Sequence, residues 1–476
     1  MLHDILAARN LPNRPDAKSV KTTILITLLL TAVTAVFADD WPQWGGPRRD
    51  GVWREDGIVD VLTTGALSLR WRAPLGAGYS GPAVTGGRVF VMDRPQSAPL
   101  PLPPSADAKK KKQGPRASVG NERVVCLSDT TGEILWTCEY PTTYTIGYPS
   151  GPRVTPTVDG GRVFTLGAMG DLHCLEAETG RVLWRKNAMR DYGAKPPTWG
   201  WASNLLVDGQ RLIGMIGGEG SAVVAFDTRD GRELWRALTA RQIGYCPPMI
   251  FELCGRRQLV IWHGEALNGL EPETGRVLWS VPFDTKSGMA ISVPAVKNDR
   301  IWVSCQMAGA MMVDLSGGLD NPRIVWQHST GAKPEIPFAT AGLNTVMSTL
   351  LWRDGYLYGV SLYGEFACLK ADTGERVWTT LAPTSGGTEP RDRWSTAFLI
   401  PHQNRILIFN ELGDLIAARL SSQGYEELSR VHLIDADMLP GAGPKTRRVV
   451  WSHPAFANRS VYARNDHELL CVSMRQ

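Results

Sequence analysis

Short apolar runs alternate with glycine-containing turns along almost the whole sequence. The stretch Gly151–Asn187 shows the pattern most clearly, with runs at Arg153–Val158, Arg162–Leu166, Leu172–Glu176 and Arg181–Lys186. Val, Leu, Phe and Thr fill these runs, and glycine supplies the positive φ angle that tight hairpin turns require. The pattern predicts four short antiparallel strands joined by hairpins.

The same unit recurs along the chain, and most copies end in T-G-x-x-x-W or a close variant. The units are Tyr79–Glu139, Gly151–Asn187, Trp201–Leu238, Tyr245–Phe283, Ile291–Ser329, Val346–Ala382, Arg393–Leu433 and Trp451–Met474. The closing residues are Gly132, Trp136, Gly180, Trp184, Gly231, Trp235, Gly275, Trp279, Trp326, Gly374 and Trp378. Successive closing tryptophans lie 44 to 52 residues apart, a period typical of a propeller or a solenoid.

The two ends of the repeat region complement each other. The last unit holds only three strands, and Leu67–Leu75 resembles an isolated outer strand with Trp71 in the closing position. Pairing of this segment with the last unit closes a ring and removes the exposed sheet edges. We therefore predict an all-β protein, an eight-bladed β-propeller over residues 67–476. Its seventh blade has lost the tryptophan, and Arg430 falls near that place.

The closing motif has a physical reason. Glycine sits at the last hairpin turn of each unit, and the tryptophan four residues later lies on the outer strand. A tryptophan there can cover the joint between neighbouring blades, which stabilises the fold by roughly 1.5–3 kcal/mol for each buried ring. The repeat therefore indicates a fold more strongly than a function.

The first 66 residues have a different composition from the repeats. The apolar stretch Ile24–Phe37 follows Lys18 and Lys21 and ends before Ala38, which suits a cleaved signal peptide over residues 1–38. We therefore expect an exported protein, periplasmic or secreted; the alternative is an uncleaved membrane anchor. Residues 39–66 are rich in Trp, Gly and Pro and are expected to form an extended lead-in that packs on the surface.

One insert interrupts the first unit. Residues 94–120 contain the sequence PLPLPPSADAKKKKQG, which combines proline and lysine at high density. Such a segment cannot bury apolar surface, so we expect it to be mobile.

Composition limits the possible functions. The chain has 476 residues, of which 43% are hydrophobic and 21% charged, with 49 Gly, 32 Pro and 17 Trp. These values suit a soluble globular protein. The net charge is +4, and Lys109–Lys112 alone supplies four positive charges. Without a basic stripe we expect no nucleic-acid binding, and we expect a monomer.

The cysteines are better read as small core residues than as a site. Cys126, Cys174, Cys368 and Cys471 occupy one equivalent position on the third strands of four blades. Thiols in four separate blades cannot come within disulfide reach. The other four cysteines show no metal-ligand spacing, and their pairing stays open.

A ring of residues at one mouth of the channel is the candidate binding site. The first residues leading into the inner strands should surround that mouth, where aromatic and arginine side chains could hold a protein partner, a carbohydrate or another small ligand. The candidates are Tyr79, Arg153, Trp201, Tyr245, Arg393, Trp451 and His453. Long loops at Tyr140–Pro152, Asn187–Gly200 and Ser329–Thr345 are expected at the same mouth. The alternative is that these side chains only pack the blade joints.

No catalytic motif accompanies this ring. The sequence contains no G-x-S-x-G elbow, H-E-x-x-H helix or phosphate-binding loop. The T-G-x-x-x-W closures and the eightfold repeat resemble the quinoprotein-type (PQQ-like) β-propeller family. This family includes dehydrogenases that use pyrroloquinoline quinone (PQQ), and non-catalytic BamB-like factors that assemble outer-membrane proteins.

The resemblance to the dehydrogenases implies PQQ stacked on a disulfide between adjacent cysteines, and Ca²⁺ held by carboxylates and amides. No two cysteines are adjacent here, and the inner strands show no convincing acidic set. The resemblance to BamB-like factors implies a lipid anchor, but no cysteine lies near the signal cleavage site. We therefore expect a non-catalytic binding or scaffold module without metal, with a PQQ-dependent alcohol or sugar dehydrogenase and a BamB-like assembly factor as the alternatives.

Overall fold

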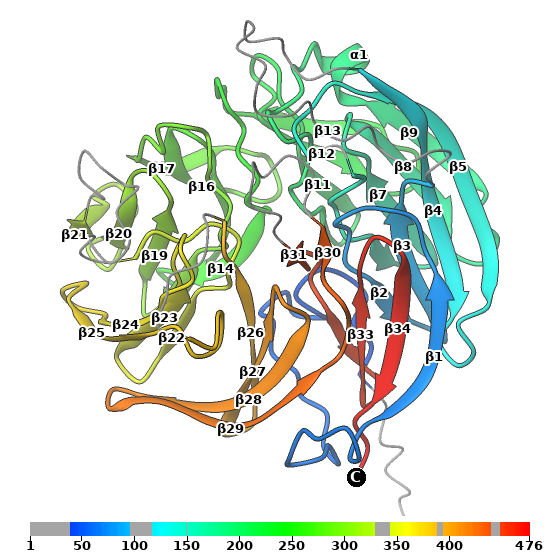
Figure 1. Ribbon diagram of the computed structural model, residues 1–476. Helices are drawn as coiled ribbons and strands as arrows, with labels where there is room; N and C mark the ends of the chain where they lie inside the picture. The colour runs from blue at the N-terminus through cyan, green and yellow to red at the C-terminus, as the bar shows by residue number, and fades with distance from the viewer. Residues whose placement is uncertain (1–38, 96–116, 149, 329–342, 388–393, 439–447) are drawn as a thin grey trace, which may run out of the picture. The chain divides into compact units, whose positions relative to one another are not determined.

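Eight four-stranded antiparallel sheets form the blades of a closed β-propeller (Figure 1). The computed structural model describes residues 39–95, 117–148, 150–328, 343–387, 394–438 and 448–476. In each blade the strands follow one another from the channel outwards, and only blade 8 takes a strand from elsewhere in the sequence. The predicted fold class is confirmed.

The strand bounds follow the predicted units. Blade 1 holds β2 (Ala83–Thr85), β3 (Arg88–Asp93), β4 (Ser118–Ser128) and β5 (Ile134–Tyr144). Blade 2 holds β6 (Thr157–Asp159), β7 (Arg162–Leu166), β8 (Asp171–Glu176) and β9 (Val182–Asn187). Blade 3 holds β10 (Leu206–Asp208), β11 (Arg211–Met215), β12 (Val223–Asp227) and β13 (Glu233–Ala237). Blade 4 holds β14 (Met249–Leu253), β15 (Arg256–Trp262), β16 (Ala266–Leu270) and β17 (Val277–Pro282).

The second half of the ring repeats this order. Blade 5 holds β18 (Ala295–Lys297), β19 (Arg300–Cys305), β20 (Gly309–Asp314) and β21 (Arg323–His328). Blade 6 holds β22 (Leu351–Arg353), β23 (Tyr356–Val360), β24 (Phe366–Lys370) and β25 (Arg376–Thr380). Blade 7 holds β26 (Ala397–His402), β27 (Arg405–Asn410), β28 (Asp414–Ser421) and β29 (Gly424–His432). Blade 8 holds β32 (Ala455–Ala457), β33 (Ser460–Arg464), β34 (Glu468–Ser473) and β1 (Ser68–Pro74).

Two small elements lie outside the blades. A two-stranded sheet pairs β30 (Asp437–Met438) with β31 (Arg448–Val449). Helix α1 (Ala188–Tyr192) starts at Asn187, whose side chain accepts a hydrogen bond from the Arg190 amide, and ends at Gly193. Within the described ranges, no helix has the length and apolar character needed to span a membrane.

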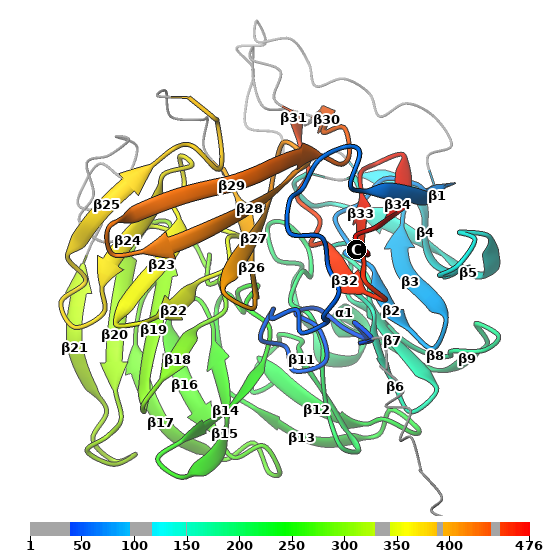
Figure 2. The same cartoon turned by 90° about the horizontal axis from the view of Figure 1, so that it is seen from below.

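The ring closes between the two ends of the propeller sequence, as predicted. β1 pairs antiparallel with β34, and Trp71 lies opposite Cys471. Figure 2 shows β1 beside β33 and β34. This pairing completes blade 8 and removes the two free edges that an open array would expose.

Most closing tryptophans join their blade to the next one. The indole N–H of Trp184 donates to the Thr228 carbonyl at 3.1 Å. Its ring also covers Gly231, where an added Cβ would lie 2.7 Å from ring atoms. The same pair of contacts joins Trp71 to the Asp129 carbonyl and Gly132, Trp136 to the Ala177 carbonyl and Gly180, Trp235 to the Pro272 carbonyl and Gly275, and Trp326 to the Ala371 carbonyl and Gly374. The motif therefore builds the joints, as its spacing predicted.

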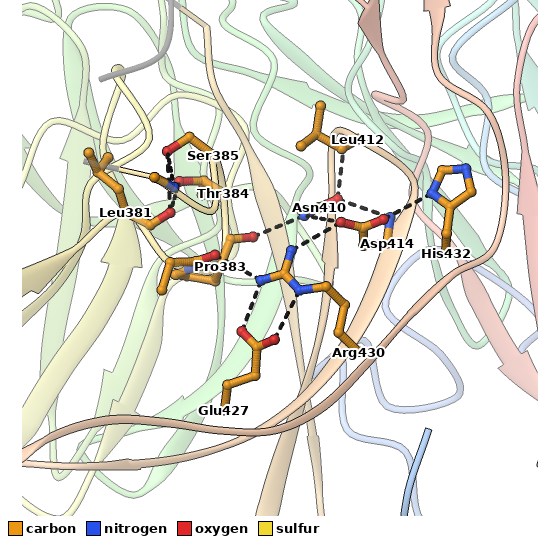
Figure 3. Close-up of polar contacts among 12 residues, drawn as sticks. Leu381, Pro383, Thr384, Ser385, Asn410, Leu412, Asp414, Glu427, Arg430 and His432 are labelled. Atoms are coloured by element: carbon orange, nitrogen blue, oxygen red, sulfur yellow. Dashed lines mark hydrogen bonds and ion pairs between the residues drawn. The ribbon is translucent and has the colours of Figure 1, made fainter. Parts of the chain in front are cut away.

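Three blades depart from this pair of contacts. Trp378 of blade 6 donates to the Ser421 carbonyl of blade 7 at 2.9 Å, but its ring covers no described glycine. Trp279 donates instead to Gln258 of its own blade at 2.6 Å. In blade 7 the closing position, opposite Ala417, belongs to Ser429, one residue before Arg430. Figure 3 shows the Arg430 guanidinium between Glu427 and Asp414, and it also donates to the Ala382 carbonyl at 2.8 Å. Arg430 thus ties blade 7 to the end of blade 6.

The lead-in packs into the propeller, so the prediction of a surface segment was wrong. Trp41 is 4% exposed and Trp53 is 1% exposed. The Trp53 ring lies 5.0 Å from both His402 of blade 7 and Phe456 of blade 8. Ser429 accepts a hydrogen bond from the Leu62 amide. The lead-in therefore fills the joint between blades 7 and 8, where the closing tryptophan is missing.

The predicted insert is shorter than residues 94–120. Arg94 is 5% exposed and its backbone pairs with Ala77, while Ser118–Gly120 belong to β4. Residues 96–116, and the predicted signal peptide at 1–38, lie outside the described residues.

The four cysteines at equivalent positions behave as core residues. All eight cysteines are free, and Cys126, Cys174, Cys368 and Cys471 are fully buried opposite closing tryptophans. Their small side chains leave room for the indole rings. The structure therefore agrees with a packing role.

Candidate functional site

A cavity of about 190 Å³ lies where the chain enters the inner strands, at the centre of the ring. All eight blades contribute to its wall, and one residue of the lead-in does as well. The lining residues are Trp44, Tyr79, Tyr148, Arg153, Trp199, Ala202, Asn204, Tyr245, Pro247, Met289, Ile291, Ser292, Val293, Val346, Met347, Ser348, Thr349, Trp394, Phe398, Trp451 and His453. Aromatic rings dominate this wall.

Five of the seven candidate residues line this one cavity. They are Tyr79, Arg153, Tyr245, Trp451 and His453. Arg393 lies outside the described residues. The structure therefore brings together candidates from blades 1, 2, 4 and 8, which are far apart in sequence.

Trp201 does not face the cavity, so its predicted placement was wrong. Its ring is 1% exposed, and its N–H donates to the Ile216 carbonyl at 2.9 Å. The cavity side of blade 3 belongs to Ala202 and Asn204 instead. In an extended segment, successive side chains point to opposite sides, and a shift of one residue reverses the assignment.

Arg153 organises the rim. Its guanidinium donates to the carbonyls of Gly147 at 2.9 Å and Tyr148 at 2.5 Å, and it also bonds Gly151. It lies 5.2 Å from the centre of the Tyr79 ring, a cation–π distance. Arg153 therefore fixes the loop that carries Tyr148.

The aromatic rings of the rim form two groups. Tyr79 and Tyr148 both lie about 6 Å from Trp451, at 6.0 and 5.9 Å between ring centres. Trp199 lies 5.7 Å from Tyr245 and 6.2 Å from Trp394. Burial raises the pKa of Tyr79 and of Tyr245 to about 12, so both phenols stay neutral at physiological pH.

Two lining residues hold a strained backbone. Tyr148 has φ of 49° and Trp394 has φ of 77°, in the left-handed region that favours glycine. Such strain persists only where the surroundings enforce it, and it gathers at functional sites. It marks the rim as a place where ring position matters.

The inner end of the cavity is closed by the lead-in. Trp44 lies edge-on to His453 at 5.4 Å between ring centres, and the His453 ring lies 3.8 Å from the Phe398 ring with their planes tilted by 33°. Burial lowers the pKa of His453 to about 3, so this imidazole is neutral at physiological pH. The Arg49 guanidinium lies over the Trp44 ring, 5.8 Å from the ring centre.

Arg49 anchors this closure. It is 6% exposed and donates to the carbonyls of Leu205 at 2.7 Å and Pro248 at 3.4 Å, next to the inner strands of blades 3 and 4. Four residues later, Trp53 lies between blades 7 and 8, on the opposite side of an eight-part ring. The lead-in therefore crosses the channel, and the cavity is blind at this end.

Sequence reasoning missed several of these residues. Trp44 belongs to the lead-in, whose path no repeat pattern predicts. Trp394 follows the chosen Arg393 by one residue. An apolar side chain next to a chosen polar one was the available signal, because only one of two neighbours can face the channel.

Comparison with known proteins gives the family. The sequence profile of the family described as outer membrane protein assembly factor BamB matches residues 120–380 and 253–423, which together exceed half of the chain. The chain belongs to this BamB family. A BamB from Moranella endobia (strain PCIT) is 23% identical over 240 residues, 48% of this chain and 57% of the relative. The chain thus matches little more than half the length of that curated relative.

Solved structures of BamB and of a dehydrogenase share the fold. The crystal structure of BamB from Moraxella catarrhalis matches with a TM-score of 0.53 and 14% identity, over 86% of this chain and 97% of that one. The quinohemoprotein alcohol dehydrogenase from Comamonas testosteroni matches with a TM-score of 0.52 and 12% identity, over 91% of this chain and 80% of that one. At these identities the likeness concerns the fold alone.

The cavity wall does not fit a quinone–calcium centre of the kind that the dehydrogenase resemblance implies. Calcium requires six to eight oxygen ligands, mainly carboxylates and carbonyls. Among the described lining residues there is no carboxylate, and Asn204 is the single amide. The described part of this BamB-family chain also holds no group of three His, Cys, Asp or Glu side chains placed to bind a metal.

Proposed function

We propose that this BamB-family chain is an exported, non-catalytic binding propeller that takes part in the assembly of outer-membrane proteins. It recognises a protein partner through the face on which the aromatic cavity opens. The observation that carries the proposal is the match of the BamB family profile over residues 120–423.

The chemistry of the cavity supports binding rather than catalysis. Catalysis by proton transfer needs a group whose pKa lies near the working pH. Among the described lining residues, burial raises the pKa of Tyr79 and of Tyr245 to about 12 and lowers the pKa of His453 to about 3. Neither type exchanges protons readily at neutral pH. Large aromatic side chains, in contrast, are the residues that dominate binding energies at protein interfaces.

A capture experiment tests the proposal. The tagged full-length chain is incubated with detergent-solubilised outer membranes of its own organism, and the barrel-assembly machinery is quantified by mass spectrometry. We expect enrichment over a tagged control protein, and a loss of enrichment for Trp199→Ala at the cavity rim. Val182→Ala and Val377→Ala, which are exposed on outer strands, should retain it. No enrichment for the unaltered chain would refute the assembly role.

A second measurement tests the quinone alternative. The purified chain is mixed with PQQ and Ca²⁺, and quinone absorbance and dye reduction with alcohols or sugars are recorded. We expect no retained quinone after gel filtration and no dye reduction. Retained quinone together with substrate-dependent dye reduction would replace the binding proposal with a dehydrogenase.

A further inference from the structure

The central cavity has the size of one six-membered ring. Its volume is about 190 Å³, and an apolar protein cavity of roughly 150 Å³ is enough to bind benzene. Rings approach it from several sides: Tyr79, Tyr148, Trp199, Tyr245 and Trp451 all line it. Edge-to-face and offset contacts with these rings favour an aromatic guest by about 0.5–1.5 kcal/mol for each pair, beyond simple burial.

Several polar side chains of the wall are hydrogen-bonded within the propeller itself. The Asn204 side-chain oxygen accepts from the Thr155 amide at 2.8 Å. Ser292 donates to the Val346 carbonyl at 2.9 Å, and Ser348 lies 3.2 Å from the Thr396 hydroxyl. At the rim, the Trp451 N–H donates to Glu411 at 3.3 Å. The wall therefore presents mainly ring faces and aliphatic groups to a guest.

These contacts select against sugars and cations. A sugar carries hydroxyl groups around its ring, and each hydroxyl buried without a partner costs about 1–3 kcal/mol. A cationic guest would meet the positive charge of Arg153, and no described lining residue is a carboxylate. An uncharged aromatic ring is the guest whose chemistry matches this wall.

Trp44 limits how far a guest can enter. It closes the inner end of the cavity, and its ring is held between His453 and the Arg49 guanidinium. A ring in the cavity would rest on Trp44, while anything attached to it stays at the loop face with Tyr148 and Trp199. A ring on the side of a longer chain fits this arrangement.

We propose that the central cavity receives one aromatic side chain of an extended polypeptide, with Trp44 setting the depth of entry. The inference rests on the proposed binding function and names the group that is recognised. Strands of outer-membrane barrels carry aromatic girdles at both membrane interfaces, so unassembled chains of this class offer such side chains.

Small amides test the cavity directly. Binding of N-acetylphenylalaninamide, N-acetylleucinamide, N-acetyllysinamide and methyl glucoside to the full-length chain is measured by saturation-transfer NMR and calorimetry. We expect the phenylalanine amide to bind about tenfold more tightly than the other three probes. Equal binding of the leucine amide, or preference for the glucoside or the lysine amide, would overturn the proposal.

Variants that fill the cavity provide the structural control. Ala202→Phe and Val293→Phe each place a ring inside it from different blades, and each should weaken binding of the phenylalanine amide by about tenfold. Ala237→Phe, on outer strand β13, is the matched control and should leave binding unchanged. Trp44→Ala should let the larger N-acetylnaphthylalaninamide bind about tenfold more tightly than it binds the unaltered chain. Unchanged binding in both folded filling variants would overturn the proposal.

The two proposals fail in different ways. If the barrel-assembly machinery is not captured but the phenylalanine amide binds as expected, the proposed assembly role is wrong. The proposal that the cavity receives an aromatic side chain is then still supported. If folded Ala202→Phe captures the machinery as well as the unaltered chain does, the partner does not use the cavity. The proposal that the cavity receives an aromatic side chain is then wrong, while the assembly role is still supported.

Discussion

At the scale of single residues, a glycine and a tryptophan in neighbouring blades define five of the eight joints. Gly231 has φ of 71°, and the Trp184 ring lies against its α-carbon. Two independent demands therefore exclude a side chain at this position: the left-handed backbone and the space taken by the indole. Both demands explain why glycine recurs four residues before tryptophan.

We expect Gly231→Ala to destabilise the protein by about 2–4 kcal/mol, since it combines a left-handed backbone cost with overpacking against Trp184. Gly209→Ala is the matched control, because Gly209 has φ of 60° in the same blade but an added Cβ would meet nothing within 4 Å. That variant should lose only about 1 kcal/mol. Urea unfolding followed by circular dichroism measures both. Equal losses would show that the indole contact contributes nothing.

At the scale of elements, strand β1 and the lead-in complete parts of the ring that the repeats leave unfinished. β1 supplies the outer strand of blade 8. The lead-in supplies Trp53 to the joint between blades 7 and 8, where β29 carries Ser429 in place of tryptophan. Both the strand β1 and the lead-in precede the first blade in sequence, and both stabilise the ring at blades 7 and 8, where it would otherwise open.

The pairing of β1 with β34, which closes the ring and is called the seam below, should depend on Trp71 more strongly than the other joints depend on their tryptophans. We expect Trp71→Ala to cost about 3–5 kcal/mol and to speed hydrogen exchange in β1 and β34, because Trp71 lies opposite Cys471 and bonds to Asp129 of blade 1. Hydrogen exchange with mass spectrometry measures the effect. The control is Trp378→Ala in blade 6, whose four strands follow one another in sequence. Exchange in β34 that is no faster than in this control would contradict a special role of the seam.

At the scale of the whole molecule, the lead-in links opposite sides of the ring. Arg49 binds carbonyls beside blades 3 and 4, and its charge has no ion-pair partner within the part of the chain that the structure describes. Burial lowers the pKa of Arg49 to about 10, which still leaves it charged at neutral pH. A buried guanidinium bonded to carbonyls is a strong local constraint.

We expect Arg49→Met to destabilise the propeller by about 2–4 kcal/mol, because it removes three charge-assisted hydrogen bonds from a buried site, to the Leu205 and Pro248 carbonyls and the Gln43 side-chain oxygen. It should also expose the lead-in to limited proteolysis. Arg54→Met is the matched control in the same segment. The Arg54 side chain is 32% exposed and, among the described residues, bonds only Asp50 and Val52, so its loss should stay within about 0.5 kcal/mol. Thermal unfolding and limited proteolysis of both variants show whether the lead-in, where it crosses the channel, stabilises the ring.

The candidate site was predictable in its location but not in each member. The entry to every inner strand could be found from the repeat, and this gave Tyr79, Arg153, Tyr245, Trp451 and His453. The assignment failed at Trp201 because side chains alternate along an extended segment, and neighbours of similar character do not reveal which one faces the channel. Trp44 could not be found at all, since it reaches the cavity from outside the repeat.

The sequence alone determined the strands, the number of blades and the closure of the ring, because these follow from local patterns: apolar alternation, glycine turns and a periodic tryptophan. Tertiary structure alone decided the blind cavity, its ring-lined wall and the place of the lead-in. These depend on contacts between residues that lie more than 150 positions apart, such as Arg49 with Leu205. Local patterns carry no information about such contacts, because the free energy that selects them comes from packing and desolvation in the folded chain.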